Sequence, residues 1–131
     1  MEDEIRPLVL TVPSLVVVVD DDESVRESLP DLLRQCGFAS AAYASAEEFL
    51  SSDAIEQTSC LILDIAMPGM SGIELQRELV RRRLPIPVIF ITGHADDIDR
   101  RRLLEDGAVE CLFKPFSDTQ LPDAVAAALG S

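Results

Sequence analysis

The chain has 131 residues, which leaves room for one domain, and 47% of them are hydrophobic, enough to bury a sizeable core. Its formal net charge of −13 argues against a domain that grips nucleic acid directly, because such binding needs a basic face. An acidic chain fits better with binding cations or a basic partner surface. No apolar run approaches the roughly 20 residues of a membrane span, and the acidic start does not resemble a secretory signal, so we expect a cytoplasmic protein.

Short apolar runs alternate with amphipathic stretches along the chain. Residues 1–13 are expected to form a flexible leader, and residues 14–131 one domain. The expected strands are 15–19, 38–43, 60–63, 88–91 and 109–113. The expected helices are 24–36, a short one opened by Ser45, 72–83, 96–106 and a last one that ends near 129. Fivefold alternation predicts an α/β fold, a parallel sheet with helices on both faces.

Local signals refine these elements. Ser45 and Glu48 have the spacing of a reciprocal capping box. Pro30 falls inside the first expected helix and predicts a kink or a late start, whereas Pro122 is tolerated if the last helix begins there. Three cysteines, Cys36, Cys60 and Cys111, lie among apolar neighbours with no paired spacing. We expect all three to be buried, reduced thiols.

Polar residues follow four of the expected strands. Asp20 and Asp21 come after the first, Asp64 after the third, Thr92 after the fourth and Lys114 after the fifth. Ligands of open parallel sheets bind outside the carboxyl ends of the strands, so these side chains are expected to share one rim. An EF-hand loop at the acidic run is excluded, because its glycine and distal glutamate are absent.

This set of side chains predicts phosphoryl transfer. Three carboxylates in one place repel one another unless a cation binds, and an all-oxygen cluster favours Mg²⁺. The Asp64 carboxylate can then act as a nucleophile. Lys114 is placed to neutralise one phosphoryl oxygen, and Thr92 to donate a hydrogen bond to another.

Four runs in order resemble the receiver domain of two-component response regulators. They are Val17–Asp21, Leu61–Gly72, Ile91–His94 and Lys114–Phe116, and the resemblance spans residues 14–129. Among receiver domains, these runs most resemble those of the nitrogen-fixation transcriptional regulators. It implies a doubly wound, flavodoxin-like (CheY-like) fold with five strands in the order 2-1-3-4-5 and five helices.

The resemblance also implies roles for individual residues. Asp64 would be the phosphoacceptor, with Thr92 sensing the phosphoryl group and Lys114 pairing with it. The metal ligands would be Asp21, Asp20 (mainly through a bound water), Asp64 and the backbone carbonyl of Ala66. The Lys114–Pro115 bond is expected to be cis. His94 would overhang the site and influence attack of water on the phosphoaspartate.

Cys111 departs from the family pattern. The family commonly has tyrosine or phenylalanine three residues before the lysine, and this ring changes rotamer when the threonine moves. Cysteine cannot reproduce that change in volume. Phe113 lies two residues further on, so we expect it on the same face of the strand, where it could substitute in part.

The resemblance implies signalling rather than catalysis as the function. A sensor histidine kinase would phosphorylate the domain, and phosphorylation would shift a two-state equilibrium in the fourth helix and fifth strand. The face formed by the fourth helix, fifth strand and fifth helix could then bind a second copy or a target. Alternatives are the receiver part of a longer DNA-binding transcriptional regulator, a module that binds without phosphorylation, and an aspartyl phosphatase. Ala66 speaks against the phosphatase, because such enzymes carry a second aspartate at that position.

Overall fold

The computed structural model describes residues 14–93 and 99–130. The strands of this part are β1 (Leu15–Val19), β2 (Ala39–Tyr43), β3 (Thr58–Asp64), β4 (Val88–Thr92) and β5 (Glu110–Phe113). The α-helices are α2 (Glu23–Gln35), α3 (Ala46–Leu50), α4 (Gly72–Arg81), α5 (Arg100–Glu105) and α6 (Gln120–Gly130). A 3₁₀ helix, Asp53–Gln57, precedes β3 and was not predicted. The expected leader, His94 and the first residues of the expected helix 96–106 lie outside the described residues.

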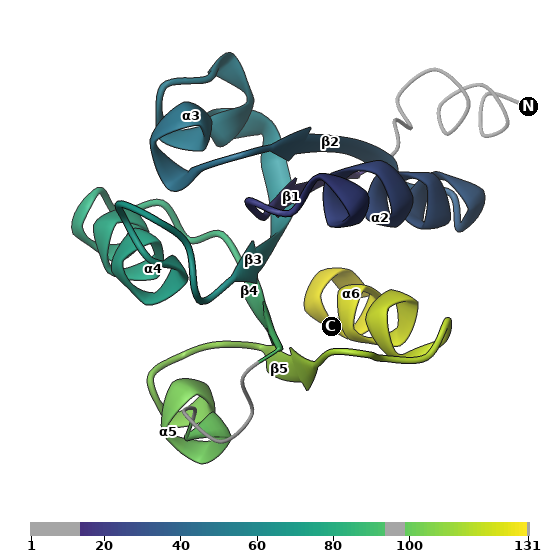
Figure 1. Ribbon diagram of the computed structural model, residues 1–131. Coiled ribbons are helices and arrows are strands. Elements are labelled where there is room, and N and C mark those ends of the chain that lie inside the picture. Colours follow the sequence, from purple (N-terminus) through teal and green to yellow (C-terminus); the bar gives the residue numbers. More distant parts are fainter. Residues whose placement is uncertain (1–13, 94–98, 131) are drawn as a thin grey trace, which may run out of the picture.

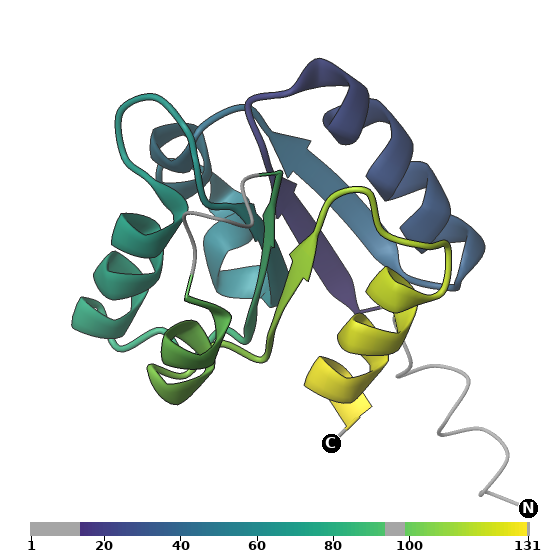
Figure 2. The same ribbon diagram turned by 60° about the horizontal axis from the view of Figure 1, so that its bottom comes forward.

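The strands form one parallel sheet in the order β2-β1-β3-β4-β5, which confirms the expected topology. Helices α2 and α6 cover one face, and α3, α4 and α5 cover the other (Figure 1). Because all strands run the same way, their carboxyl ends meet at a single edge of the sheet (Figure 2). The connections that leave this edge carry the polar residues expected to form the site.

Two hydrophobic cores lie on opposite faces of the sheet, and β1 contributes to both. Val17 and Val19 belong to the core under α3, α4 and α5, whereas Val16 and Val18 belong to the core under α2 and α6. All four valines are fully buried. Successive side chains of a strand point to opposite faces, so a strand covered on both sides must be apolar at every position. This explains the uninterrupted valine run.

Both prolines are accommodated inside helices. Helix α2 begins at Glu23, with the Asp22 side chain accepting from the Ser24 N–H, and continues through Pro30, which is buried. A late start of this helix is therefore wrong. Helix α6 begins at Gln120, two residues before the expected start, so Pro122 lies in its first turn. First-turn N–H groups have no partner within the helix, and a proline there loses no hydrogen bond.

The complete capping box lies at α4 rather than at α3. Ser45 caps α3 by accepting from the Glu48 N–H, but the Glu48 carboxylate accepts from Ala44 N at 3.3 Å instead of from Ser45. The expected reciprocal box at Ser45 is therefore only half formed. At α4 the Ser71 hydroxyl accepts from Glu74 N at 3.1 Å, and the Glu74 carboxylate accepts from Ser71 N at 2.8 Å. This cap fixes the start of the helix that follows the Asp64 loop.

The cysteines differ from the expectation in one case. Cys60 and Cys111 are buried, as expected, but Cys36 is exposed at the C-cap of α2. Leu29 and Leu33 lie on the buried side of α2, but the helix ends at Gln35, and Cys36 lies at its exposed end. Burial raises the pKa of the Cys60 thiol to about 12, and burial likewise raises the pKa of Cys111. None of the three is in a disulfide.

These environments predict selective labelling of the native protein. A thiol-reactive reagent at pH 8 is expected to modify Cys36 rapidly, because the thiolate is the reactive form and only an exposed thiol is accessible. Cys60 and Cys111 should react only after denaturation. Intact-mass measurement over time checks this result, with Cys36→Ser as the control that should remain unlabelled. Rapid labelling of the Cys36→Ser variant in the native state would contradict the buried positions.

Candidate phosphoacceptor and metal site

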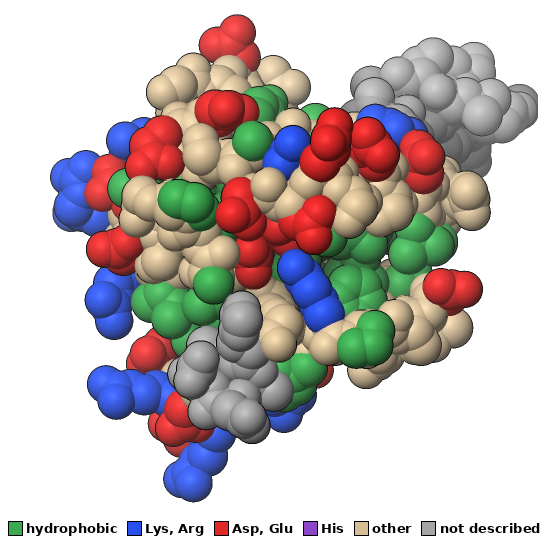
Figure 3. Space-filling view, in the orientation of Figure 1, with side chains coloured by type: hydrophobic (Ala, Val, Ile, Leu, Met, Phe, Trp, Pro, Cys, Tyr) green, Lys and Arg blue, Asp and Glu red, His purple; other side chains and the backbone are tan. Residues whose placement is uncertain are grey.

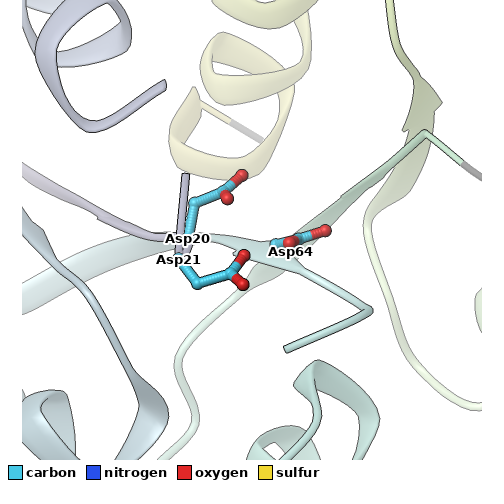
Figure 4. Close-up of side chains that lie close together, drawn as sticks. All are labelled: Asp20, Asp21 and Asp64. Atoms are coloured by element: carbon cyan, nitrogen blue, oxygen red, sulfur yellow. The ribbon is translucent and has the colours of Figure 1, made fainter. Parts of the chain in front are cut away.

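Three aspartates meet at the carboxyl edge of the sheet. Asp20 and Asp21 directly follow β1, and Asp64 is the last residue of β3. Each offers a carboxylate oxygen, and these oxygens lie within 4.8 Å of one another. The three carboxylates project to the same side of the strand ends (Figure 4). The structure thus brings together the acidic residues singled out in the sequence.

The three carboxylates differ in exposure. Asp20 is fully buried and Asp64 is 5% exposed, whereas Asp21 is exposed. Acidic side chains gather in the middle of this face of the molecule, and a basic side chain lies directly beside them (Figure 3). At a separation near 4.8 Å and an effective dielectric of 20, each pair of ionised carboxylates repels by roughly 3 kcal/mol. The cluster therefore favours binding of a cation.

Asp20 is held by three neighbours. Its carboxylate accepts a hydrogen bond from the Lys114 ammonium at 3.1 Å and another from Asp22 N at 2.9 Å. The Arg26 guanidinium donates to the Asp20 backbone carbonyl at 3.1 Å. A fully buried carboxylate needs such partners, because burial without them is costly. Both Asp20 oxygens already have a partner, whereas the Asp21 carboxylate accepts no hydrogen bond from the described part of the chain.

Asp64 has an unusual proton affinity. Burial raises its pKa, and the negative charges of Asp20 and Asp21 raise it further, to about 7. The Lys114 ammonium and a hydrogen bond from the Ala66 backbone N–H act in the opposite direction. The ionised form of Asp64 is thus destabilised in the absence of a cation. A divalent cation bound beside it would stabilise the ionised form.

Thr92 and Lys114 complete the rim. Thr92 is the last residue of β4 and is 1% exposed, and Lys114 directly follows β5. The Lys114 N–H donates to the Thr92 carbonyl at 2.8 Å, which ties the two strand ends together. The Lys114–Pro115 peptide bond is cis, as expected. Lys114 keeps 27% of its side chain exposed, so its ammonium borders both the buried Asp20 and solvent.

The loop after Asp64 has two features that the sequence did not reveal. A Cβ atom at Gly72 would lie 2.3 Å from the backbone oxygen of Asp64, so only glycine fits there. Gly72 N donates to the Ile65 carbonyl at 3.0 Å and closes the loop. From α3, the Glu47 carboxylate accepts a hydrogen bond from Met70 N at 3.2 Å. The glycine is visible in the sequence, but its neighbour in space is not.

Cys111 packs where the family commonly has an aromatic ring. It is 2% exposed and belongs to the core under α3, α4 and α5, and the partly buried Phe113 packs against the same core. The two side chains therefore share a face of β5, as expected. The Arg100 guanidinium donates to the Cys111 carbonyl at 3.3 Å and pairs with the Glu110 carboxylate, which connects α5 to β5.

The acidic cluster has the donor set of a magnesium site. Mg²⁺ prefers oxygen ligands at ~2.1 Å, commonly one or two carboxylates with several waters. The described cluster offers carboxylate oxygens close together, one of them on the exposed Asp21, so water can complete the coordination shell. Histidine and cysteine ligands, which select other metals, are absent from this group of described residues.

Comparison with known proteins gives a consistent result. Residues 16–126 match the response regulator receiver domain family. The chain belongs to this family. It is 49% identical over 115 residues to nodulation protein W of Bradyrhizobium diazoefficiens, covering 88% of this chain and 51% of that protein. It is 42% identical over 115 residues to the transcriptional regulatory protein FixJ of Azorhizobium caulinodans, covering 88% and 54%.

Solved structures agree with this assignment. The response regulator StyR has a TM-score of 0.83 at 46% identity, covering 91% of this chain and 60% of that one. FixJ-N has a TM-score of 0.80 at 38% identity, covering 92% and 96%. The chain spans about half the length of the curated relatives that it matches. Receiver domains are signalling domains that histidine kinases phosphorylate, and they bind Mg²⁺ at an acidic pocket. Among the helices of the described residues, none has the length and apolarity needed to cross a membrane.

Proposed function

We propose that Asp64 accepts a phosphoryl group from the phosphohistidine of a sensor histidine kinase. The observation that carries this proposal is the buried Asp64 carboxylate, grouped with two other carboxylates within 4.8 Å and influenced by the Lys114 ammonium. A carboxylate in this setting is held in place by its strand and faces the rim, where a donor can approach. Family membership supports the same role. The proposed location of the protein is the cytoplasm, as the sequence predicts.

The transfer step uses the residues of this chain in defined roles. An Asp64 carboxylate oxygen attacks the phosphorus atom, and the phosphorus–nitrogen bond of the donor breaks. The electron pair of that bond passes to the imidazole nitrogen, which takes up a proton. The Lys114 ammonium, now paired with Asp20, is placed to interact with one phosphoryl oxygen, and the Thr92 hydroxyl with another.

The proposed metal ligands are Asp21, Asp64 and the Ala66 backbone carbonyl, with Asp20 acting through a bound water. The hydrogen bonds to both Asp20 oxygens support this division, because they hold that carboxylate against Asp22 N and Lys114, whereas the Asp21 carboxylate accepts no hydrogen bond from the described residues. Mg²⁺, when bound, supplies positive charge that neutralises the carboxylates and draws electron density from the phosphoryl oxygens. The exposed side chain of Asp21 allows direct access from solvent.

The proposed output surface is the face formed by α5, β5 and α6. Arg100 links α5 to β5, so a movement of Thr92 at the end of β4 can be passed to this face through the neighbouring strand. A hollow of about 320 Å³ on it is lined by Glu110, Leu112, Gln120, Asp123, Ala124 and Ala127. This face would bind a second copy of the chain. In a longer protein of the length of its relatives, the domain would control a DNA-binding transcriptional regulator.

Asp64→Asn is expected to abolish phosphoryl uptake. The uncharged amide is a poor nucleophile at phosphorus, while its size preserves the fold. The protein is incubated with Mg²⁺ and acetyl phosphate, and intact-mass spectra are recorded for a mass increase of one phosphoryl group. The control is Asp53→Asn, which removes an exposed carboxylate of the 3₁₀ helix and should take up the group like wild type. Uptake by Asp64→Asn at the wild-type rate would refute the assignment.

A further inference from the structure

We propose that Glu47 is a positioning residue for the metal site, because it holds the loop after Asp64 in the shape that presents the Ala66 carbonyl. The inference rests on the proposed function and extends it to a residue of α3, an element outside the acidic cluster. The Glu47 carboxylate lies in the first turn of α3 and reaches across to the backbone N–H of Met70, at 3.2 Å.

The loop depends on this contact because it has few others. Its ends are fixed: Ile65 N donates to the Ile91 carbonyl at 3.1 Å, and Gly72 N donates to the Ile65 carbonyl at 3.0 Å. Between these ends, residues 66–70 make no backbone–backbone hydrogen bond within the described chain. Of the loop N–H groups, that of Met70 donates a hydrogen bond to the Glu47 carboxylate.

The packing around the loop is shaped to admit the Glu47 carboxylate. Gly69 has a φ of +75°, which favours glycine, and a Cβ atom there would lie 3.0 Å from Glu47 Oε2. The Met67 side chain is 8% exposed and packs into the core under α3, α4 and α5. The loop is therefore held by a buried methionine on one side and by the Glu47 carboxylate on the other. The Ala66 carbonyl lies between Asp64 and this anchored segment.

Glu48 provides a matched control within the same helical turn. Both glutamates are exposed, carry the same charge and lie in the first turn of α3. Glu48, however, accepts from Ala44 N at 3.3 Å and, among the described residues, has no hydrogen bond to the loop. Removal of either glutamate takes one negative charge from the first turn of α3. A difference between the two variants therefore reports the hydrogen bond to Met70 and not the general field.

The experiment compares Glu47→Ala, Glu47→Gln and Glu48→Ala with wild type. The chain has no tryptophan, so Mg²⁺ binding is followed by NMR titration of backbone amides. Glu47→Ala is expected to raise the Kd for Mg²⁺ about tenfold, the usual effect of losing a residue that orients a ligand. Glu47→Gln keeps an acceptor oxygen and should retain most of the affinity. Glu48→Ala should bind like wild type.

Two further readouts separate positioning from stability. The Met70 amide should exchange rapidly with solvent in Glu47→Ala, but slowly in Glu47→Gln and Glu48→Ala. Phosphoryl uptake from acetyl phosphate should be slowed in Glu47→Ala at low Mg²⁺ and restored at saturating Mg²⁺. A role limited to stability would change the Tm without this dependence on Mg²⁺ concentration.

The outcomes distinguish the inference from the proposed function. Equal Mg²⁺ affinity and equal Met70 exchange in Glu47→Ala and Glu48→Ala would overturn the role of Glu47, even if wild type takes up phosphoryl. If wild type binds Mg²⁺ and Glu47→Ala loses affinity, but wild type takes up no phosphoryl group, the positioning role stands and the phosphoacceptor assignment falls. Absence of Mg²⁺ binding by wild type would overturn both.

Discussion

Replacing Gly72 with alanine is expected to lower the free energy of unfolding by about 3 kcal/mol. The added Cβ would lie 2.3 Å from the Asp64 backbone oxygen and 3.1 Å from the Ile65 Cα. Both contacts are with backbone atoms at the end of β3, so no side chain can rotate away. The first turn of α4 or the end of the strand must move. Urea unfolding followed by circular dichroism measures the change.

Gly130 is the matched control for Gly72. Both glycines belong to helices, but a Cβ atom at Gly130 would meet nothing within 4 Å. Alanine is the better helix former, so Gly130→Ala should leave stability unchanged within about 0.5 kcal/mol or raise it. The two substitutions should thus change the free energy of unfolding by different amounts, because only the Cβ atom at Gly72 clashes with the backbone. Equal stability of Gly72→Ala and Gly130→Ala would show that the loop yields without cost.

The stability of the protein is expected to depend on pH through the carboxyl group of Asp64. The pKa of Asp64 is about 7 in the folded protein, above its ordinary value of 3.8. The folded state therefore holds a proton that the unfolded state releases. The contribution of Asp64 to the free energy of unfolding falls as pH rises from about 4 to 7. Asparagine does not titrate. Without Mg²⁺, the free energy of unfolding of Asp64→Asn minus that of wild type should increase by about 3 kcal/mol between pH 5 and pH 8.

Comparison of the two proteins cancels the pH dependence of the carboxyl groups outside the acidic cluster, because these groups are present in both. Unfolding is measured by urea titration at pH 5 and at pH 8, in the presence of a chelator. Addition of Mg²⁺ at pH 8 should then stabilise wild type more than Asp64→Asn, since binding to the folded state favours it. A constant difference in stability across this pH range would contradict the raised pKa of Asp64.

Much of the fold follows from patterns within single elements. The valine run of β1 is apolar at every position because helices cover both faces, and this marks a parallel sheet without knowledge of any neighbour. Asp20, Asp21, Asp64, Thr92 and Lys114 could be grouped because each follows a strand, and parallel strands end at one edge. The grouping of these residues at one edge of the sheet could thus be predicted from position along the chain.

Other features depend on contacts between elements and could not be predicted. Cys36 has apolar neighbours, but its exposure is decided by where α2 ends. Glu48 has capping-box spacing at α3, yet its carboxylate turns to Ala44, and the spacing alone cannot choose between the two N–H groups. Glu47 and Gly72 acquire their importance from the loop and strand that they touch.

The ion pair between Lys114 and Asp20 has a consequence for the synthesis of the protein. These residues are 94 positions apart. Asp20 follows β1 and Lys114 follows β5, so the pair forms only when both strands have joined the sheet. During translation, the acidic residues emerge early and their cationic partner late. A nascent chain that lacks β5 therefore has the three aspartates without this lysine, and the complete set of side chains comes together only when the whole sheet has assembled.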